Sequence, residues 1–338
     1  MNLRSTIAAL GLSLAALVPA QAQEAVKVGL GTDGFVHLPL FVAYDAGLFK
    51  EEGLDVELVK FKGGGAAMSG LVGASVEICS CSVQNAINAT EKGAPVLLIG
   101  AMIDQYASNI VVTEEVAKRI GLTPEMPVEA RLKALKGLKI AAAGAGGSAD
   151  FLVRHLAGAA GLSPEGDMSL LYMNDSGAML ASFDRNRIDG FALSSPTSDI
   201  AVLDHKGQML FDMSAGQYEP LAGYPSIAIS ARKDWVGGHE DTAVKFLKAI
   251  IRADRMIHDE PEKAKAAVRS RFESTSDPVF EAAWTSNLNT YPETPAITQE
   301  TVARVMTFLT SIQGQEIPGP ASRYLDTRYV ERAVAELN

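Results

Sequence analysis

Groups that bind metals or act as nucleophiles are scarce in this sequence. Its 338 residues include five histidines and two cysteines. The histidines form no short ligand spacing with a cysteine or with one another, as a zinc site would require; they are His37, His155, His205, His239 and His258. The sequence also has no Gly-x-Ser-x-Gly elbow, no Walker loop with its lysine and no dinucleotide fingerprint after a strand. We therefore expect no metal, no cofactor and no catalytic residue.

Basic residues are outnumbered by acidic ones. The chain has 30 lysines and arginines against 40 aspartates and glutamates, for a net charge of −10 at pH 7. An acidic balance argues against nucleic acid or an anionic membrane as the partner. It does not exclude a small anionic ligand, because local hydrogen-bond donors can bind an anion inside an acidic protein.

The apolar run at the start of the chain is too short to span a membrane, which takes about 18 to 20 residues. Arg4 precedes the apolar segment Ile7–Val18, and Ala20-Gln21-Ala22 follows as a small-residue cleavage site. This pattern predicts a secretory signal peptide over residues 1–22, with Gln23 as the first mature residue. No cysteine follows the cleavage site, so a lipoprotein is not indicated. We expect export to a bacterial periplasm.

The two cysteines, Cys79 and Cys81, are two residues apart. In a strand they would point to the same side, but a disulfide between residues i and i+2 closes a very tight ring. We favour two small thiols in the core. A catalytic thiol stays open as a weaker alternative, because no histidine lies nearby in sequence to activate it.

A complete βαβ unit follows the predicted signal peptide. Val26–Leu30 alternates as a strand does, and apolar residues recur at helical spacing over Leu40–Phe49. A second strand begins near Leu54. In such units ligands collect beyond the carboxyl ends of the strands. The loop Thr32–His37 occupies that place.

The end of this unit carries a family resemblance. Ala43–Val56, which reads AYDAGLFKEEGLDV, closely resembles the A-x-x-x-G-L-F-x-x-x-G-L-x-V signature of periplasmic solute-binding proteins. These proteins serve ABC importers of sulfonates, taurine, nitrate and thiamine precursors (NMT1/THI5-like). Five later segments are also similar to the family pattern: Ala74–Cys79, with Glu77 in place of the usual aspartate, Gly93–Gly100, Leu135–Ala143, Arg187–Leu193, which contains Asp189, and Arg323–Val330.

The resemblance implies an α/β architecture, the type II periplasmic-binding-protein fold, with two doubly wound lobes joined by a two-strand hinge. It assigns residues 23–107 and 232–338 to the first lobe and residues 108–231 to the second. Asn109–Thr113 would cross into the second lobe, and Gly223–Ser230 would return and pair with it. We expect the helical C-terminal region to pack on the first lobe, with Trp284 and Tyr291 in its core; its predicted helices are Thr242–His258, Pro261–Phe272, Asp277–Asn287, Thr298–Gln313 and Arg328–Leu337.

Small polar residues follow several of the predicted strands, and the fold would bring them together. In the first lobe they are Thr32, Asp33, His37, Ser80 and Ser82; in the second they are Ser148, Asn174, Ser176, Ser194 and Ser195, with Tyr224 near the hinge. Hydroxyl and amide donors suit an oxyanion, as do the free N–H groups at helix starts. Serines at helix starts are also ordinary N-caps, and this alternative stays open for Ser82 and Ser148.

Asp33 complicates an anion site, because a carboxylate at the loop would repel an anion. It could face solvent, accept a bond from a backbone N–H in a structural turn, or bind an N–H group of the ligand. His37 could supply a donor or a positive charge in compensation.

The resemblance implies a periplasmic substrate-binding component of an ABC importer, which captures a small ligand and docks on an inner-membrane permease as a monomer. A sulfonate or small carboxylate is the first choice of ligand, with an aromatic one favoured by Phe35, and a pyrimidine is the second. Two alternatives use the same scaffold: a desulfinase-like or pyrimidine-synthesising enzyme, and a ligand sensor for a membrane receptor. The export signal favours transport over a cytoplasmic enzyme.

Overall fold

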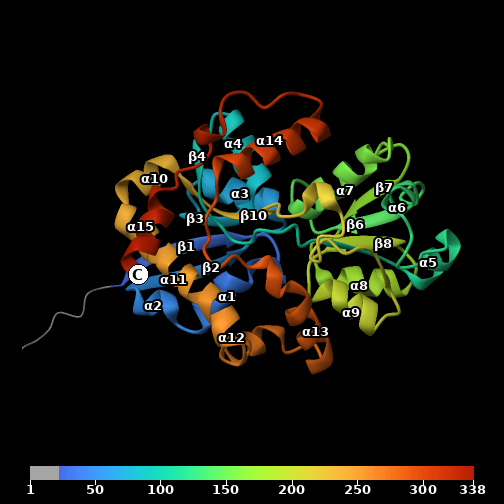
Figure 1. Cartoon of the computed structure of the whole chain (residues 1–338), viewed down its shortest axis with the longest axis horizontal. Coiled ribbons are helices and arrows are strands. Elements are labelled where there is room, and N and C mark those ends of the chain that lie inside the picture. Colours follow the sequence, from blue (N-terminus) through green and yellow to red (C-terminus); the bar gives the residue numbers. More distant parts are fainter. Residues whose placement is uncertain (1–22) are drawn as a thin grey trace, which may run out of the picture.

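Two five-stranded sheets organise the chain in the computed structural model, which describes residues 23–338 (Figure 1). The first sheet has the order β2-β1-β3-β10-β4. Its strands are β1 (Glu24–Leu30), β2 (Leu54–Lys60), β3 (Ile78–Ser82), β4 (Val96–Ala101) and β10 (Ile227–Arg232). β1 runs parallel to β2 and β3, whereas β10 is antiparallel to both of its neighbours.

The second sheet repeats this plan. Its order is β7-β6-β8-β5-β9, and β5 is antiparallel to both of its neighbours. The strands are β5 (Asn109–Val112), β6 (Lys139–Ala142), β7 (Ser169–Tyr172), β8 (Gly190–Leu193) and β9 (Gln208–Phe211). In each sheet the fourth position is therefore taken by the strand that lies next to the crossing between the lobes. The predicted fold class of two doubly wound lobes is confirmed.

The predicted pairing of the two crossing strands is wrong. β5 pairs with β8 and β9, and β10 pairs with β3 and β4. The side chain of Gln105 instead links the two segments that cross between the lobes. Its Nε2 donates to the carbonyl of Met213 at 2.8 Å, and its Oε1 accepts from the N–H of Gly223 at 2.6 Å. The chain thus crosses twice side by side, but through irregular segments. The predicted boundary at residue 232 falls at the last residue of β10, and the lobe boundaries stay a prediction.

Both lobes begin their third strand with the same carboxylate contact. In the first lobe a carboxylate oxygen of Glu77 accepts a hydrogen bond from the N–H of Lys27 at 2.8 Å. In the second, Asp189 accepts from the N–H of Lys139, also at 2.8 Å. This satisfies a backbone donor of β1 and of β6 one residue before the ladder with β3 or with β8 begins. The contact explains why an acidic residue stands at this place in both halves of the sequence.

Helices cover both faces of each sheet (Figure 1). In the first lobe these are α1 (Leu38–Asp45), α2 (Leu48–Glu51), α3 (Gly64–Val72), α4 (Val83–Glu91), α10 (Lys233–Gly238) and α11 (Glu240–Asp259). In the second they are α5 (Glu114–Ile120), α6 (Val128–Lys133), α7 (Ser148–Ala159), α8 (Ser176–Asp184) and α9 (Thr197–Leu203). The sequence interpretation missed α5, which Thr113 caps by accepting from the N–H of Val116 at 3.3 Å.

The C-terminal helices occupy nearly the predicted ranges: α11, α12 (Pro261–Val268) followed by the turn η3 (Arg269–Phe272), α13 (Asp277–Asn287), α14 (Gln299–Gln313) and α15 (Arg328–Leu337). They do not pack on the first lobe alone. α13 contacts α9, and α14 contacts α7 as well as α4 (Figure 1). These two helices therefore bridge the lobes. Trp284 and Tyr291 are each 3% exposed and lie in the core, as predicted.

Cys79 and Cys81 form a disulfide, which corrects the expectation of two unpaired thiols. Their Cα atoms are 5.3 Å apart, whereas two residues of an extended strand span about 6.6 Å. The strand is thus locally shortened, and the Cα separation falls in the range that disulfides use. The sequence argument gave most weight to the tightness of the ring and so favoured unpaired thiols.

The predicted signal peptide, residues 1–22, lies outside the described residues. Within residues 23–338, no helix combines the length and the apolar character that crossing a membrane requires.

Substitution of glycine by alanine is expected to change the stability of the fold in opposite directions at two positions. A Cβ at Gly190, in the middle of the second sheet, would collide with the carbonyl oxygen of Val111, whereas a Cβ at Gly158 on the exposed side of α7 would meet no atom within 4 Å. We expect Gly190→Ala to destabilise the fold by about 1–3 kcal/mol, because backbone cannot move aside cheaply. Gly158→Ala should stabilise it by about 0.5–1 kcal/mol through helix propensity. The urea unfolding midpoints of the two variants check both expectations. If both midpoints shifted equally in the same direction, the close packing of β8 against β5 at Gly190 would be contradicted.

Candidate ligand-binding site

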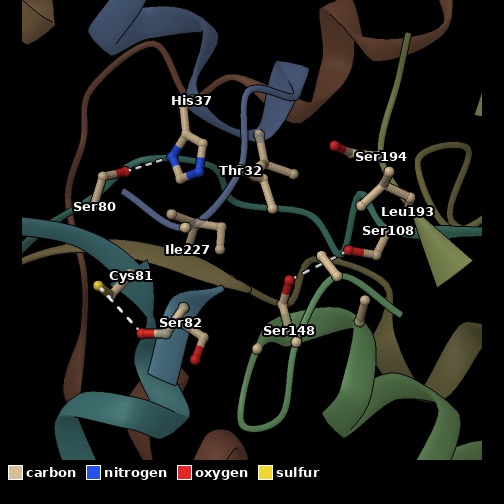
Figure 2. A pocket seen from close by; sticks show the side chains of 17 residues that line it. Thr32, His37, Ser80, Cys81, Ser82, Ser108, Ser148, Leu193, Ser194 and Ile227 are labelled. Carbon is tan, nitrogen blue, oxygen red and sulfur yellow. Dashed lines mark hydrogen bonds between the residues drawn. The ribbon is translucent and has the colours of Figure 1, made fainter. Parts of the chain in front are cut away.

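A small cavity of about 40 Å³, here called the inner cavity, lies between the two lobes (Figure 2). Six hydroxyl side chains and one imidazole line it, and they come from both lobes: Thr32, His37, Ser80, Ser82, Ser108, Ser148 and Ser194. The remaining lining residues are Gly31, Val36, Gly64, Cys81, Ala143, Gly144, Gly147, Ala149, Leu193 and Ile227. Among these described residues none is a lysine, an arginine or a carboxylate. The inner cavity is therefore polar without formal charge.

The first lobe closes directly on the second at this cavity. The N–H of Phe35, in the turn η1 (Phe35–His37), donates to the carbonyl of Ser195 at 2.7 Å. The hydroxyl of Tyr291 then donates to the carbonyl of Phe35 at 3.1 Å. Gly34 lies so close to the hydroxyl of Ser194 that a Cβ would collide with it. The structure therefore represents the closed form of the two lobes.

Glycine loops from both lobes meet beside the cavity. Gly63 has a positive φ of 93°, and a Cβ placed there would lie 3.2 Å from the Cα of Gly144 in the other lobe. A Cβ at Gly65 would lie 2.8 Å from the carbonyl oxygen of Ala145. Side chains at these positions would hold the lobes apart, so glycine is needed for the approach.

His37, the last residue of η1 in the loop that follows β1, is buried, with its Nδ1 2.7 Å from the hydroxyl oxygen of Ser80 (Figure 2). Burial lowers the pKa of His37 to about 4, and the carboxylate of Asp33 offsets only part of this effect. At pH 7 the imidazole is neutral. It can donate a hydrogen bond to a ligand or accept one from it. It does not supply the positive charge that the sequence analysis considered.

Ser82 and Ser148 both stand at helix starts but differ in what they do. Ser82 is the N-cap of α4, where its hydroxyl accepts from the N–H of Asn85 at 3.3 Å. Ser148 is the first residue of α7, Gly147 is the N-cap, and the Ser148 side chain makes no capping bond. Its hydroxyl lies 3.3 Å from that of Ser108 and points into the cavity (Figure 2). The capping alternative thus holds for Ser82 and is wrong for Ser148.

The sequence interpretation missed Ser108 and Asn85. Ser108 precedes β5, is 3% exposed and lines the cavity. Asn85 lies one turn into α4, behind Gly64, and its buried Nδ2 has no hydrogen-bond partner among residues 23–338. A buried amide donor without a partner costs free energy. Asn85 lies three residues after Ser82, which places both at the same end of the helix. This spacing could have identified Asn85 from the sequence.

Three predicted site residues that do not line the inner cavity lie in a second hollow of about 200 Å³, here called the outer chamber: Asp33, Asn174 and Ser176. Asp33 is half-exposed and forms an ion pair with Lys60. Of the roles considered for Asp33, the solvent-facing one agrees with this geometry. The outer chamber adjoins the inner cavity, since Thr32, Ala143 and Leu193 line both.

Ser195 and Tyr224 line neither hollow. Ser195 is fully buried, and its hydroxyl accepts from Nδ2 of Asn287 at 2.7 Å. The hydroxyl of Tyr224 accepts from Nε2 of Gln84 at 3.0 Å, and its ring packs on Tyr106 with centroids 5.5 Å apart. Both residues join parts of the fold around the site. Within residues 23–338 no group of His, Cys, Asp and Glu could hold a metal ion.

Two doubly wound lobes that enclose a small polar cavity define a type II periplasmic-binding-protein fold. The sequence model of the NMT1-like family matches residues 20–270, and the chain belongs to that family. The Bacillus subtilis (strain 168) protein YtlA, whose name describes a binding protein, is 25% identical over 273 residues, which are 80% of this chain and 78% of YtlA.

Solved structures share this fold. A protein from Bordetella bronchiseptica RB50 has a TM-score of 0.81 at 20% identity, covering 94% of this chain and 98% of its own. The alkanesulfonate-binding protein SsuA of Xanthomonas axonopodis pv. citri, bound to MOPS, has a TM-score of 0.71 at 17% identity, covering 91% and 100%. The periplasmic nitrate-binding protein NrtA of Synechocystis PCC 6803 has a TM-score of 0.69 at 16% identity, covering 94% and 89%.

The buried state of His37 predicts a pH dependence of stability. Its pKa is about 4 in the folded protein and about 6.5 when unfolded. Between these values the unfolded state binds more protons, so stability falls as the pH falls. From pH 7 to pH 5 His37 contributes a loss of about 2 kcal/mol, which His37→Gln should remove. Burial also lowers the pKa of His155 to about 4, so part of the wild-type loss should persist in that variant. Urea unfolding at both pH values measures it.

The exposed His239 provides the control for that measurement, because it is solvated in the folded protein. His239→Gln should keep the wild-type loss of stability between pH 7 and pH 5. A His37→Gln variant that loses as much stability as wild type would contradict a buried neutral imidazole.

Proposed function

We propose that this chain is the periplasmic substrate-binding component of an ABC importer. It captures a small organic anion, a sulfonate or a carboxylate, between its two lobes. The observation that carries the proposal is the inner cavity, which hydroxyl groups from both lobes line and which contains no carboxylate. Membership of the NMT1-like family supports it, as does the fold shared with sulfonate-binding and nitrate-binding proteins.

The start of one helix from each lobe supplies the attraction for an anion. Ser82 and Ser148, at the starts of α4 and α7, both line the inner cavity. The first N–H groups of a helix lack partners within the helix, and the helix dipole favours negative charge at that end. Hydroxyl donors add hydrogen bonds that stabilise an oxyanion more than a neutral ligand. Charge-assisted binding is thus available without a lysine or arginine.

Binding and closure are coupled because the lining residues belong to both lobes. Ser80 and Ser82 lie within β3 in the first lobe, Ser82 as its last residue, whereas Ser148 and Ser194 follow β6 and β8 in the second. A ligand that contacts both sets binds the closed form more tightly than an open one. It therefore shifts the hinge equilibrium towards closure by its differential affinity. The closed form would then dock on an inner-membrane permease as a monomer, and the signal peptide expected at residues 1–22 would deliver it to the periplasm.

An enzyme on the same scaffold is less well supported. The pair of His37 and Ser80 has the spacing of a base and a nucleophile, at 2.7 Å. A triad also needs a third group that orients the base, and no carboxylate bonded to His37 is found among residues 23–338. With a pKa of about 4 the imidazole is also a weak base.

A thermal-shift screen of residues 23–338 tests the proposed function. The panel contains sulfonates, aliphatic and aromatic carboxylates, nitrate and pyrimidines. A ligand at 100 times its dissociation constant stabilises the fold by about 2.7 kcal/mol. We expect an anion of the first two classes to raise the melting temperature and to be recovered unchanged. A compound that is consumed would favour an enzyme, and a shift with pyrimidines alone would move the ligand to that class.

The hydroxyl of Ser148 provides a second test. Because it points into the inner cavity without capping α7, Ser148→Ala should weaken binding of the anion found in the screen by about 1–3 kcal/mol. Isothermal titration calorimetry measures the change. Ser169→Ala, at an exposed serine at the start of β7, is the matched control and should bind as wild type does. Unchanged affinity in Ser148→Ala would remove Ser148 from the site.

A further inference from the structure

We propose that the outer chamber is a second binding subsite, which takes an anionic group at the far end of a ligand held in the inner cavity. This inference rests on the proposed function and specifies its substrate: a short organic molecule with two anionic groups, such as a sulfonate and a carboxylate.

The two hollows form one continuous route. Thr32, Ala143 and Leu193 line both of them, so a ligand head in the inner cavity can extend past these residues. The outer chamber, at about 200 Å³, is the larger of the two, against about 40 Å³ for the inner cavity. The inner cavity thus suits one small polar group, and the rest of a ligand has space only outwards.

Charged side chains distinguish the outer chamber from the inner cavity. The inner cavity has no charged lining residue among those described, whereas Lys60, Arg271 and Asp33 line the outer chamber. Each cation is paired with one carboxylate, Lys60 with Asp33 and Arg271 with Asp45, so the wall offers charged N–H donors without a net charge. Since Lys60 and Asp33 are both about half-exposed, their ion pair is a weak competitor for a new anion.

The side chain of Arg271 is fixed by its neighbours and keeps one donor nitrogen for a ligand. Its Nε and Nη2 donate to the two carboxylate oxygens of Asp45 at 2.8 and 2.6 Å, and its guanidinium lies 4.6 Å from the ring centroid of Phe41. Its Nη1 has no hydrogen-bond partner among residues 23–338. A guanidinium fixed in this way is preorganised to donate to a carboxylate.

The second lobe contributes the polar side chains Asn174, Ser176 and Thr197 to the outer chamber, and beside them a group of apolar ones. Met173, Met179 and Ile200, from the second lobe, line it together with Leu193. These side chains can pack against the carbon chain or ring that joins the two anionic groups. The cations come from the first lobe and the C-terminal region, so the second group would also strengthen the bridge between lobes.

A matched ligand series tests the subsite by calorimetry. Propane-1-sulfonate, 3-sulfopropanoate and 3-aminopropane-1-sulfonate differ only at the far end, and benzoate against terephthalate repeats the comparison on a ring. We expect the ligand with two anionic groups to bind at least about fivefold more tightly than its partner with one, in the series whose head group binds. Because the cations are partly exposed, this ratio should fall as salt rises.

Variants at the chamber wall should move that ratio in opposite directions. Lys60→Met should lower it without abolishing it, because Arg271 still lines the chamber, and Asp33→Asn should raise it, because Asp33 no longer competes for Lys60. Lys50→Met removes an equal charge at an exposed position of α2, outside both hollows, and should keep the wild-type ratio.

The possible failures are distinguishable. Equal binding of the ligands with one and two anionic groups overturns the subsite and leaves the proposed function standing. Tightest binding of the aminosulfonate would make Asp33 the ligand-binding group and also overturn it. If no member of either series binds, the small organic anion of the proposed function falls, and this inference falls with it.

Discussion

The close approach of two glycine loops is the constraint on which the site depends. Gly63 and Gly65 of the first lobe meet Gly144 and Ala145 of the second, backbone against backbone. No side chain separates the lobes there, so the strand ends behind these loops come near enough to share one small cavity. The hydrogen bond from Phe35 to Ser195 fixes the same approach on the other side of the cavity. Cavity size and lining both follow from how closely the backbones meet.

The helices that bridge the lobes limit how much a ligand has to contribute. α14 contacts α4 and α7, and Asn287 at the end of α13 bonds to Ser195. These contacts already stabilise closure in the protein itself. A ligand then needs only enough differential affinity to shift an equilibrium between open and closed forms. Tight capture of a small molecule is therefore compatible with a cavity that offers hydroxyl groups and helix starts but no fixed charge.

Sequence patterns predicted what is local and repeated. The helical periodicity of the C-terminal region gave helix ranges close to the observed ones, and the acidic residues at 77 and 189 marked equivalent strand starts. What the patterns could not predict is partnership. The composition of an apolar segment such as Ile227–Arg232 predicts a strand, but it does not indicate which strands lie beside it. The pairing of this segment was therefore predicted wrongly. Thr32, His37 and Ser148 were placed at strand or helix ends and do line the inner cavity, whereas Ser195 and Tyr224 point elsewhere.

Arg271 illustrates the limit most clearly. It lies in a turn far along the chain from Asp33 and Lys60, and only the path of the C-terminal region brings it to the same hollow. Nothing in its sequence surroundings distinguishes it from an ordinary surface arginine, since the bidentate contact with Asp45 depends on tertiary packing. A chain with a net charge of −10 thus presents an inner cavity without charged side chains and, next to it, a chamber wall that carries Lys60 and Arg271. Net charge describes the whole surface, but ligand selection depends on the few groups that the fold places along the cleft.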